Sequence, residues 1–244
     1  MEEYYLTHNI RLINNKMEYR KNDIFIPIKK YNWHHILSDY GWEKIYKPWI
    51  IILNKHSDYK ERNSRYGVLD CESDGDCFFH CIANALNERD INKENYYISN
   101  DIRKMISDNI TSDQYDFIIN TYRIMKDADD FSEVWDPYEI DSLEDFKEMI
   151  ETSGHIYWCD FMLLQLLCEI LKINIYILNT NEYENDYSIY NTMCEKKRDY
   201  DNIFLILENN CHFKLLGYFN DRMISYFKNE MIPIELKRLF KLKE

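Results

Sequence analysis

Apolar side chains recur at helical spacing in four parts of the chain. Phe78, Ile82 and Leu86 fall on one face of a predicted helix that follows a short turn. The other predicted helices cover residues 100–122, 142–150 and 161–171. Ser142 and Asp160 stand where the last two begin, and their side-chain oxygens can accept hydrogen bonds from the first N–H groups of a helix.

Two continuous apolar runs, 173–178 and 203–207, have the length and composition of buried strands. Residues 1–63 hold three of the five tryptophans and end in a polar linker, so we expect a folded N-terminal extension. Residues 64–218 carry the helices and strands of the main domain. In residues 219–244, Leu236, Leu239 and Phe240 share one helical face, which predicts a C-terminal helical tail that packs back on the domain.

The composition indicates a globular protein of a reducing compartment. A chain of 244 residues with 45% hydrophobic residues can hold one domain with a sizeable core plus an extension. Seven cysteines without regular spacing do not suit a disulfide framework. The N-terminus lacks the basic and apolar regions of a signal peptide. The longest apolar candidate for a membrane span, 156–178, is interrupted by charges, so we predict a cytoplasmic protein without a membrane partner.

The net charge of -13 argues against a nucleic-acid partner, because no run of the sequence forms a basic patch. Residues 101–152 carry much of this charge, with 15 Asp or Glu against 5 Lys or Arg. This segment is either a solvated face or a surface for a basic protein partner.

The candidate chemistry centres on Cys77, which the pattern places at the N-terminus of the first predicted helix. Unpaired N–H groups and the helix dipole stabilise a thiolate at that position. The turn Asp74-Gly75-Asp76 can aim backbone N–H groups at a developing oxyanion beside the sulfur. A nucleophile next to an anion site is suited to acyl transfer. The alternative is that Cys77 is a buried structural thiol, as many free cysteines are.

A metal site is a weaker interpretation of the same region. Cys71, Cys77, His80 and Cys81 contain no paired Cys-x-x-Cys motif, and His34-His35 has no second pair of ligands nearby. We therefore predict no metal and no other cofactor.

The segment Asp74 to Phe79, followed by Ile82-Ala83, resembles the nucleophile segment of the ovarian-tumour (OTU) family of cysteine proteases, which remove ubiquitin from proteins. Trp158-Cys159-Asp160, before the helix at 161–171 and the strand at 173–178, resembles the family's second landmark, although Cys159 stands where a glycine is usual. His212, after the strand at 203–207, resembles the family's histidine hairpin. The resemblance covers about residues 64–218. It implies an α+β fold related to papain-like proteases, with a small mixed or antiparallel sheet between helices.

The resemblance also implies the site residues. Cys77 would be the nucleophile and Asp74 an active-site residue of the turn. Two histidines remain as the base: His212 follows a buried strand and matches the family, whereas His155 lies in a connection.

The group that orients the imidazole is open. Many family members have Asp or Asn two residues after the histidine, but here Lys214 occupies that position and cannot accept a hydrogen bond. We expect the Lys214 side chain to point away, or another group to do the orienting. The candidates are Asp70, Glu72, Asn209 and Asn210, and a dyad without an orienting group is a further alternative.

The implied function is a deubiquitinating cysteine protease that hydrolyses isopeptide bonds at the ubiquitin C-terminus through a thioester. Its partner would be ubiquitin or polyubiquitin, with ubiquitin-like modifiers open as further substrates, and a viral or bacterial origin would place it in the host cytosol. The alternatives are a catalytically weak or inactive OTU-like ubiquitin-binding module, or an interaction protein that reuses the fold.

Overall fold

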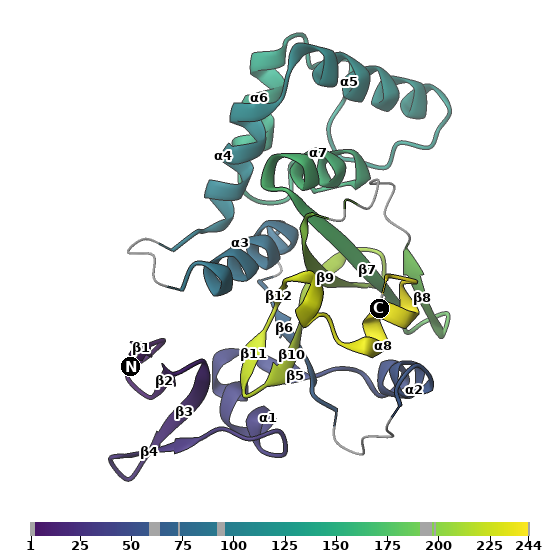
Figure 1. Ribbon diagram of the computed structural model, residues 1–244. Helices are drawn as coiled ribbons and strands as arrows, with labels where there is room; N and C mark the ends of the chain where they lie inside the picture. Colours follow the sequence, from purple (N-terminus) through teal and green to yellow (C-terminus); the bar gives the residue numbers. More distant parts are fainter. Residues whose placement is uncertain are drawn as a thin grey trace.

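A mixed sheet lies between two layers of helices, and a separate four-stranded sheet flanks it (Figure 1). The computed structural model describes residues 3–58, 64–72, 74–91, 96–190, 197 and 199–243. In the described residues the main sheet has eight strands. Six of them follow the order β5 (Trp42–Lys44), β6 (Tyr66–Asp70), β10 (His212–Asn220), β9 (Asp201–Glu208), β7 (Ile173–Asn181) and β8 (Asp186–Tyr190).

The two strands predicted from apolar runs, β7 and β9, run parallel to each other. The other pairs are antiparallel, which makes the sheet mixed. Side chains alternate across it because successive residues of a strand point to opposite faces. Ile175 and Ile177 belong to one core, whereas Tyr176 and Leu178 belong to the other.

The first core lies between the sheet and a layer of five helices: α3 (Cys77–Arg89), α4 (Ser99–Asn109), α5 (Ser112–Asp127), α6 (Leu143–Glu151) and α7 (Phe161–Leu171). The second core lies under α2 (Lys47–Lys55) and α8 (Ile234–Leu239). The caps expected at Ser142 and Asp160 are confirmed. Ser142 accepts from the N–H of Asp145, and Asp160 accepts from those of Met162 and Leu163.

The run predicted as one helix over 100–122 is two helices, α4 and α5. Helix α4 ends at Asn109 and Thr111 caps α5: its hydroxyl accepts from Gln114 N–H at 3.3 Å, and Gln114 Oε1 accepts from Thr111 N–H at 2.9 Å. This reciprocal pair of hydrogen bonds is a capping box, and the Thr-x-x-Gln motif that predicts it is present in the sequence.

The N-terminal extension forms a four-stranded sheet from β1 (Glu3–Tyr5), β2 (Ile10–Ile13), β3 (Lys16–Lys21) and β4 (Ile24–Pro27), followed by α1 (Trp33–Ile36) and a 3-10 helix at Leu37–Tyr40. Trp33 is fully buried and stacks on Phe219 of β10. The rest of the extension joins the main body. Strand β5 pairs with β6, and Trp49 of α2 donates to Thr180 Oγ1 of β7 at 2.8 Å.

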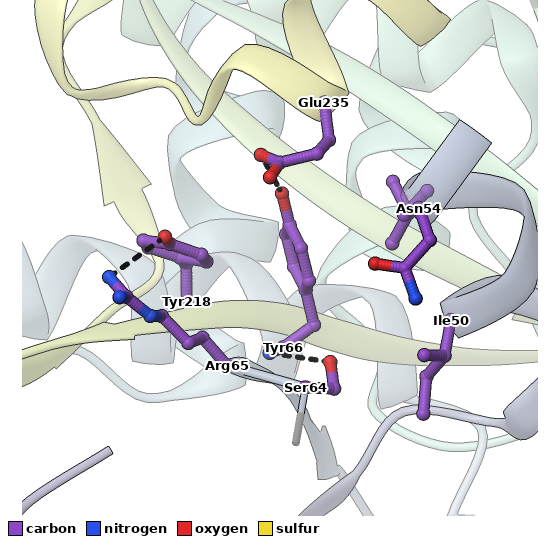
Figure 2. A pocket seen from close by; sticks show the side chains of 8 residues that line it. Ile50, Asn54, Ser64, Arg65, Tyr66, Tyr218 and Glu235 are labelled. Carbon is purple, nitrogen blue, oxygen red and sulfur yellow. Dashed lines mark hydrogen bonds between the residues drawn. The ribbon is translucent and has the colours of Figure 1, made fainter. Parts of the chain in front are cut away.

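The C-terminal segment, predicted as a helical tail, begins with two short strands. β11 (Arg222–Ile224) turns back on β10, and β12 (Tyr226–Phe227) pairs with β9. Helix α8 then packs on the second core through Leu236. Figure 2 shows a small pocket lined by residues of α2, β6 and α8. In it Tyr66 of β6 donates to Glu235 of α8, close to Ile50 of α2. In the part of the chain that the structure describes, every helix is too short or too polar to cross a membrane.

Candidate active site

The turn before α3 has a backbone that only glycine suits. Gly75 has a φ of +93°, and a Cβ on it would lie 2.4 Å from the carbonyl carbon of Gly154. Asp74 Oδ1 accepts the N–H of Asp76 at 2.9 Å and closes the turn. The other Asp74 oxygen, Oδ2, lies 3.1 Å from His80 Nε2. Asp74 therefore holds the shape of the turn and is directed at His80.

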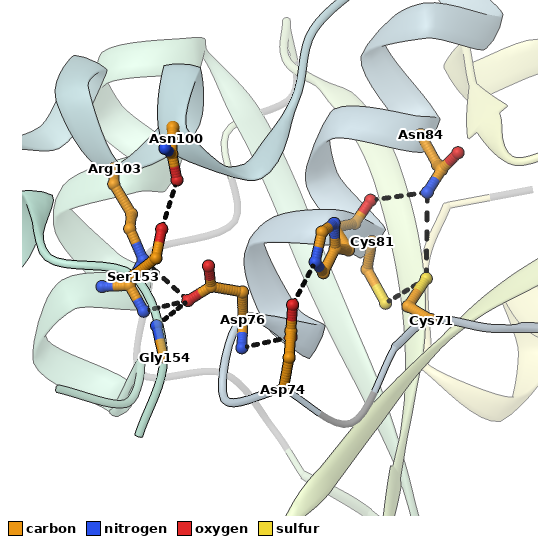
Figure 3. A network of polar contacts seen from close by, with 10 residues as sticks. Cys71, Asp74, Asp76, Cys81, Asn84, Asn100, Arg103, Ser153 and Gly154 are labelled. Atoms are coloured by element: carbon orange, nitrogen blue, oxygen red, sulfur yellow. Dashed lines mark hydrogen bonds and ion pairs between the residues drawn. The ribbon is translucent and has the colours of Figure 1, made fainter. Parts of the chain in front are cut away.

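The Asp76 side chain is anchored in the interior by Arg103, as Figure 3 shows. Asp76 is 2% exposed and Arg103 is 0% exposed. Asp76 Oδ1 accepts from Arg103 Nε at 2.9 Å and from the N–H of Gly154 at 3.1 Å. Arg103 Nη1 also donates to the Ile150 carbonyl at 2.8 Å, and Nη2 to the Tyr157 carbonyl at 3.1 Å. One guanidinium thus ties the turn to α4, α6 and the segment before α7.

Arg103 was not among the residues expected at the site. The signal that could have found it is its place beside Ile102 and three residues before Ile106, on the buried face of the helix. A buried arginine requires an anionic partner, and Asp76 is that partner.

Asp76 was expected to belong to the oxyanion turn. Its N–H is already bound to Asp74, so Asp76 is not expected to donate to an oxyanion. The N–H of Cys77 is the first of α3, where an amide has no acceptor inside the helix.

Cys77 begins α3 and lies against the start of β10. Its Sγ accepts the N–H of Phe213 at 3.4 Å, and the rings of Phe78 and Phe213 pack edge to face with centroids 5.3 Å apart. The thiol is 8% exposed, at the margin of the core. Burial raises the pKa values of the Cys81 and Cys159 thiols well above their usual value, which keeps these neighbours neutral.

His212, the first residue of β10, bridges Cys77 and Asp70. Its Nε2 lies 2.7 Å from Asp70 Oδ1 on the last residue of β6. The hydrogen bond with Cys77 raises the pKa of His212, burial lowers it, and Asp70 raises it further, so that the pKa is about 9. The imidazolium form is therefore favoured at neutral pH.

Lys214 does not point away from this site. It pairs with Asp70 across β10 and β6, is 8% exposed, and places its Nζ 3.1 Å from Asp70 Oδ2. Burial raises the pKa of Asp70, but the contacts with His212 and Lys214 lower it by more, so Asp70 is ionised. The strand geometry explains the arrangement, because residues 212 and 214 share one face of β10.

The other candidates for the orienting group contact different partners. Asn209 and Asn210 have φ values of +50° and +59° and form the turn between β9 and β10, where they accept from Glu182 N–H and Tyr190 Oη. Glu72 is exposed and lies beside Asp74 and His80. Among the described residues these three form a group of potential metal ligands, whose ligand atoms all lie within 4.8 Å of one another.

His155 is exposed and packs against Trp158, with ring centroids 5.8 Å apart. The four residues considered for zinc separate into three environments. Cys77 faces His212, His80 faces Asp74, and the sulfurs of Cys71 and Cys81 lie 3.5 Å apart. In the structure an imidazole lies between a thiol and a carboxylate. Nucleophilic acyl transfer uses these three groups as base, nucleophile and orienting acceptor, respectively.

Comparison with known families agrees with this chemistry. Residues 72–212 match the model of a family described as OTU-like cysteine protease. No curated protein sequence matches the chain significantly.

Solved structures with a similar arrangement include three OTU domains. An ovarian-tumour domain in complex with ubiquitin is 17% identical, with 71% of this chain and 80% of that chain covered and a TM-score of 0.39. An OTU deubiquitinase from Wolbachia pipientis wMel is 13% identical, with 71% and 96% covered and a TM-score of 0.42. The viral OTU domain protease from Farallon virus is 16% identical, with 64% and 85% covered and a TM-score of 0.41.

Proposed function

The chain belongs to the family of OTU-like cysteine proteases, and from that premise we propose that it is a deubiquitinating enzyme with a Cys77–His212–Asp70 site. The observation that carries the proposal is the contact of one imidazole with both other groups. His212 Nε2 lies 2.7 Å from Asp70 Oδ1, and the interaction of the same ring with the Cys77 thiol is the largest cause of its raised pKa. The three groups come from β10, β6 and the start of α3.

In the first half of the reaction, the Cys77 thiolate attacks the carbonyl carbon of the isopeptide bond. His212 holds the proton taken from the thiol, and the raised pKa of the imidazole, about 9, keeps that proton available. The tetrahedral oxyanion forms beside the N-terminus of α3, where the Cys77 N–H can donate to it. As the carbon–nitrogen bond breaks, the imidazolium gives its proton to the leaving lysine amine, and a thioester remains on Cys77.

In the second half, water attacks the thioester. His212 takes a proton from the water, the carbon–sulfur bond breaks, and the carboxylate of the product leaves. Asp70 orients the ring throughout, since its carboxylate accepts from Nε2–H in both charge states of the imidazole.

We propose ubiquitin, single or in chains, as the substrate. The support comes from the family, whose solved members include OTU domains bound to ubiquitin. The acidic segment 101–152 suits a partner whose tail is basic. Ubiquitin-like modifiers are further substrates to test, and seven cysteines without regular spacing suit action in the cytosol.

The test is a ubiquitin probe with an electrophile at its C-terminus. We expect the wild-type protein to form a covalent adduct at Cys77, and Cys77→Ala to form none. His212→Ala should label slowly and Cys81→Ala, as the matched control at a neighbouring buried thiol, should label at close to the wild-type rate. Association with the probe without labelling would instead identify a binding module, and neither association nor labelling would refute the proposal.

A further inference from the structure

The carboxylate that contacts His212 is itself held by a network that begins in the N-terminal extension. Tyr46 lies between β5 and α2, outside the residues 72–212 that match the family. Its hydroxyl donates to Glu208 Oε1 and accepts from Lys214 Nζ at 3.0 Å. Burial and the Glu208 hydrogen bond raise the pKa of Tyr46 to about 12, so the hydroxyl keeps its proton.

The Lys214 ammonium lies against three oxygen atoms. Nζ lies 3.0 Å from Tyr46 Oη, 3.0 Å from Glu208 Oε2 and 3.1 Å from Asp70 Oδ2. Burial lowers the pKa of Lys214, but these three contacts raise it by more, so the cation is retained. An ammonium held by one hydrogen bond and two ion pairs cannot turn without losing one of these contacts. Its position therefore fixes the Oδ2 atom of Asp70.

Strand register determines which residues take part. His212 lies opposite Glu208 on β9, and Lys214 lies opposite Asp70 on β6. Glu208 and Lys214 are thus diagonal neighbours on one face of the sheet, a separation that long side chains can bridge. Tyr46 reaches the same face because β5 continues the sheet beyond β6 and the chain then turns into α2.

We propose that Tyr46, Glu208 and Lys214 are positioning residues that hold the Asp70 carboxylate against His212, so that the N-terminal extension completes the active site. This inference rests on the proposed function. It gives Lys214 a role at a position where an acid or an amide would contact the histidine directly: the lysine acts through Asp70 instead. It also assigns the extension a part in the chemistry, since the hydroxyl of Tyr46 closes the network on the side away from His212.

The test compares Tyr46→Phe with Tyr66→Phe. Both changes remove only a hydroxyl that donates to a carboxylate, since Tyr66 Oη donates to Glu235 Oε2 at 3.1 Å; Tyr66 is buried and Tyr46 is partly buried. Tyr66 is at the opposite end of β6 from Asp70, so it is the matched control. The readouts are kcat/KM for a ubiquitin substrate as a function of pH, and the melting temperature.

We expect Tyr46→Phe to lower kcat/KM by about 3- to 30-fold, less than the full value of a hydrogen bond to a charged group because the effect passes through Lys214. The groups that face His212 are Cys77, Asp70, Glu208 and Lys214, and their formal charges are unchanged in this variant. The alkaline limb of the profile should nevertheless move down by about half a pH unit or more, because a loosely held Asp70 stabilises the imidazolium less. Tyr66→Phe should leave the profile in place.

Lys214→Met provides a second measurement. Removal of a cation near His212 would by electrostatics alone raise the pKa of the imidazole, whereas loss of the hold on Asp70 lowers it. We expect the downward shift, with a fall in kcat/KM of about 10- to 1000-fold.

Unchanged profiles in both variants of an active enzyme would overturn the inference, as would equal effects of Tyr46→Phe and Tyr66→Phe. An inactive wild-type protein would instead overturn the proposed function. If Lys214→Met does not fold, which its melting curve would reveal, Tyr46→Phe decides the question.

Discussion

Arg103→Met should destabilise the protein more than any surface substitution and should damage the nucleophile turn. The change removes a guanidinium that is fully buried, lies 4.0 Å from the centroid of the Phe79 ring and hydrogen-bonds to Asp76. Methionine keeps much of the apolar stem but none of the donors. Asp76 would retain the hydrogen bond from Gly154 N–H and lose its cation, and the carbonyls of Ile150 and Tyr157 would each lose a donor.

The magnitude follows from the burial of both partners. Breaking a buried ion pair by removing one partner costs about 3–5 kcal/mol, because an uncompensated charge is left in the interior. A domain has a free energy of unfolding of about 5–15 kcal/mol, so this is a large fraction of it. For a chain of this size each kcal/mol shifts the melting temperature by about 2–4 °C, which predicts a fall of about 6–20 °C.

Urea unfolding and thermal melting measure this cost. The double variant Arg103→Met/Asp76→Asn should recover part of the loss, since it removes the stranded charge as well. Lys104→Met is the control, because Lys104 is the next residue of the same helix and its side chain is 61% exposed. A loss below about 1 kcal/mol in Arg103→Met, the size expected of an exposed pair, would refute the reasoning, and so would a double variant less stable than the single one.

Four further predictions concern the site. Cys77→Ala should abolish turnover while leaving the melting curve close to that of the wild type, and NMR titration of His212 should show its pKa falling from about 9, because the thiol is the largest cause of the raised value. His212→Ala should lower turnover by about 10² to 10⁴, with a much smaller effect for His155→Ala; the reverse order in steady-state rates would overturn the choice of base. Asp70→Asn should move the alkaline limb of the rate profile to lower pH, since the imidazolium loses its carboxylate and gives up its proton earlier; a limb that stays at about 9 would exclude Asp70 as the orienting group. Gly75→Ala should reduce probe labelling strongly, because its Cβ would collide with Gly154, and labelling at the wild-type rate would show that the turn can shift at little cost.

Local patterns predicted the parts of the fold that local forces determine. The helix that starts at Cys77, the caps at Ser142 and Asp160 and the buried strand β7 all follow from spacing or from a residue type within a few positions. The break between α4 and α5 is local too, but the apolar periodicity on either side of Thr111 obscured it. The strands β11 and β12 could not be foreseen, because each depends on a partner strand, β10 or β9, being in place.

The site divides in the same way. The helical spacing of apolar residues placed Cys77 at the start of a helix, and Gly75 indicated the turn before it. The partners of these residues were not, since Arg103 reaches Asp76 and Tyr46 reaches Lys214 only through the tertiary fold. Lys214 was read as a misfit for the site because a cation cannot accept from an imidazole. In the sheet Lys214 lies opposite Asp70 and contacts it. The pairing of β10 with β6 that brings them together cannot be predicted from a local sequence pattern.

The order of strands in the sheet has a consequence for the newly made chain. Strand β10 lies between β6 and β9, so the last long strand to be synthesised fills a gap in the middle of the sheet. His212 and Asp70 are 142 positions apart, and the loop that joins them must close before they can meet. Ribosomes add about 5–20 residues per second, so Cys77 emerges many seconds before His212, its proposed base. On the proposed mechanism the thiol lacks the imidazole of His212 during that interval, so we expect a truncated or partly folded chain to have no protease activity.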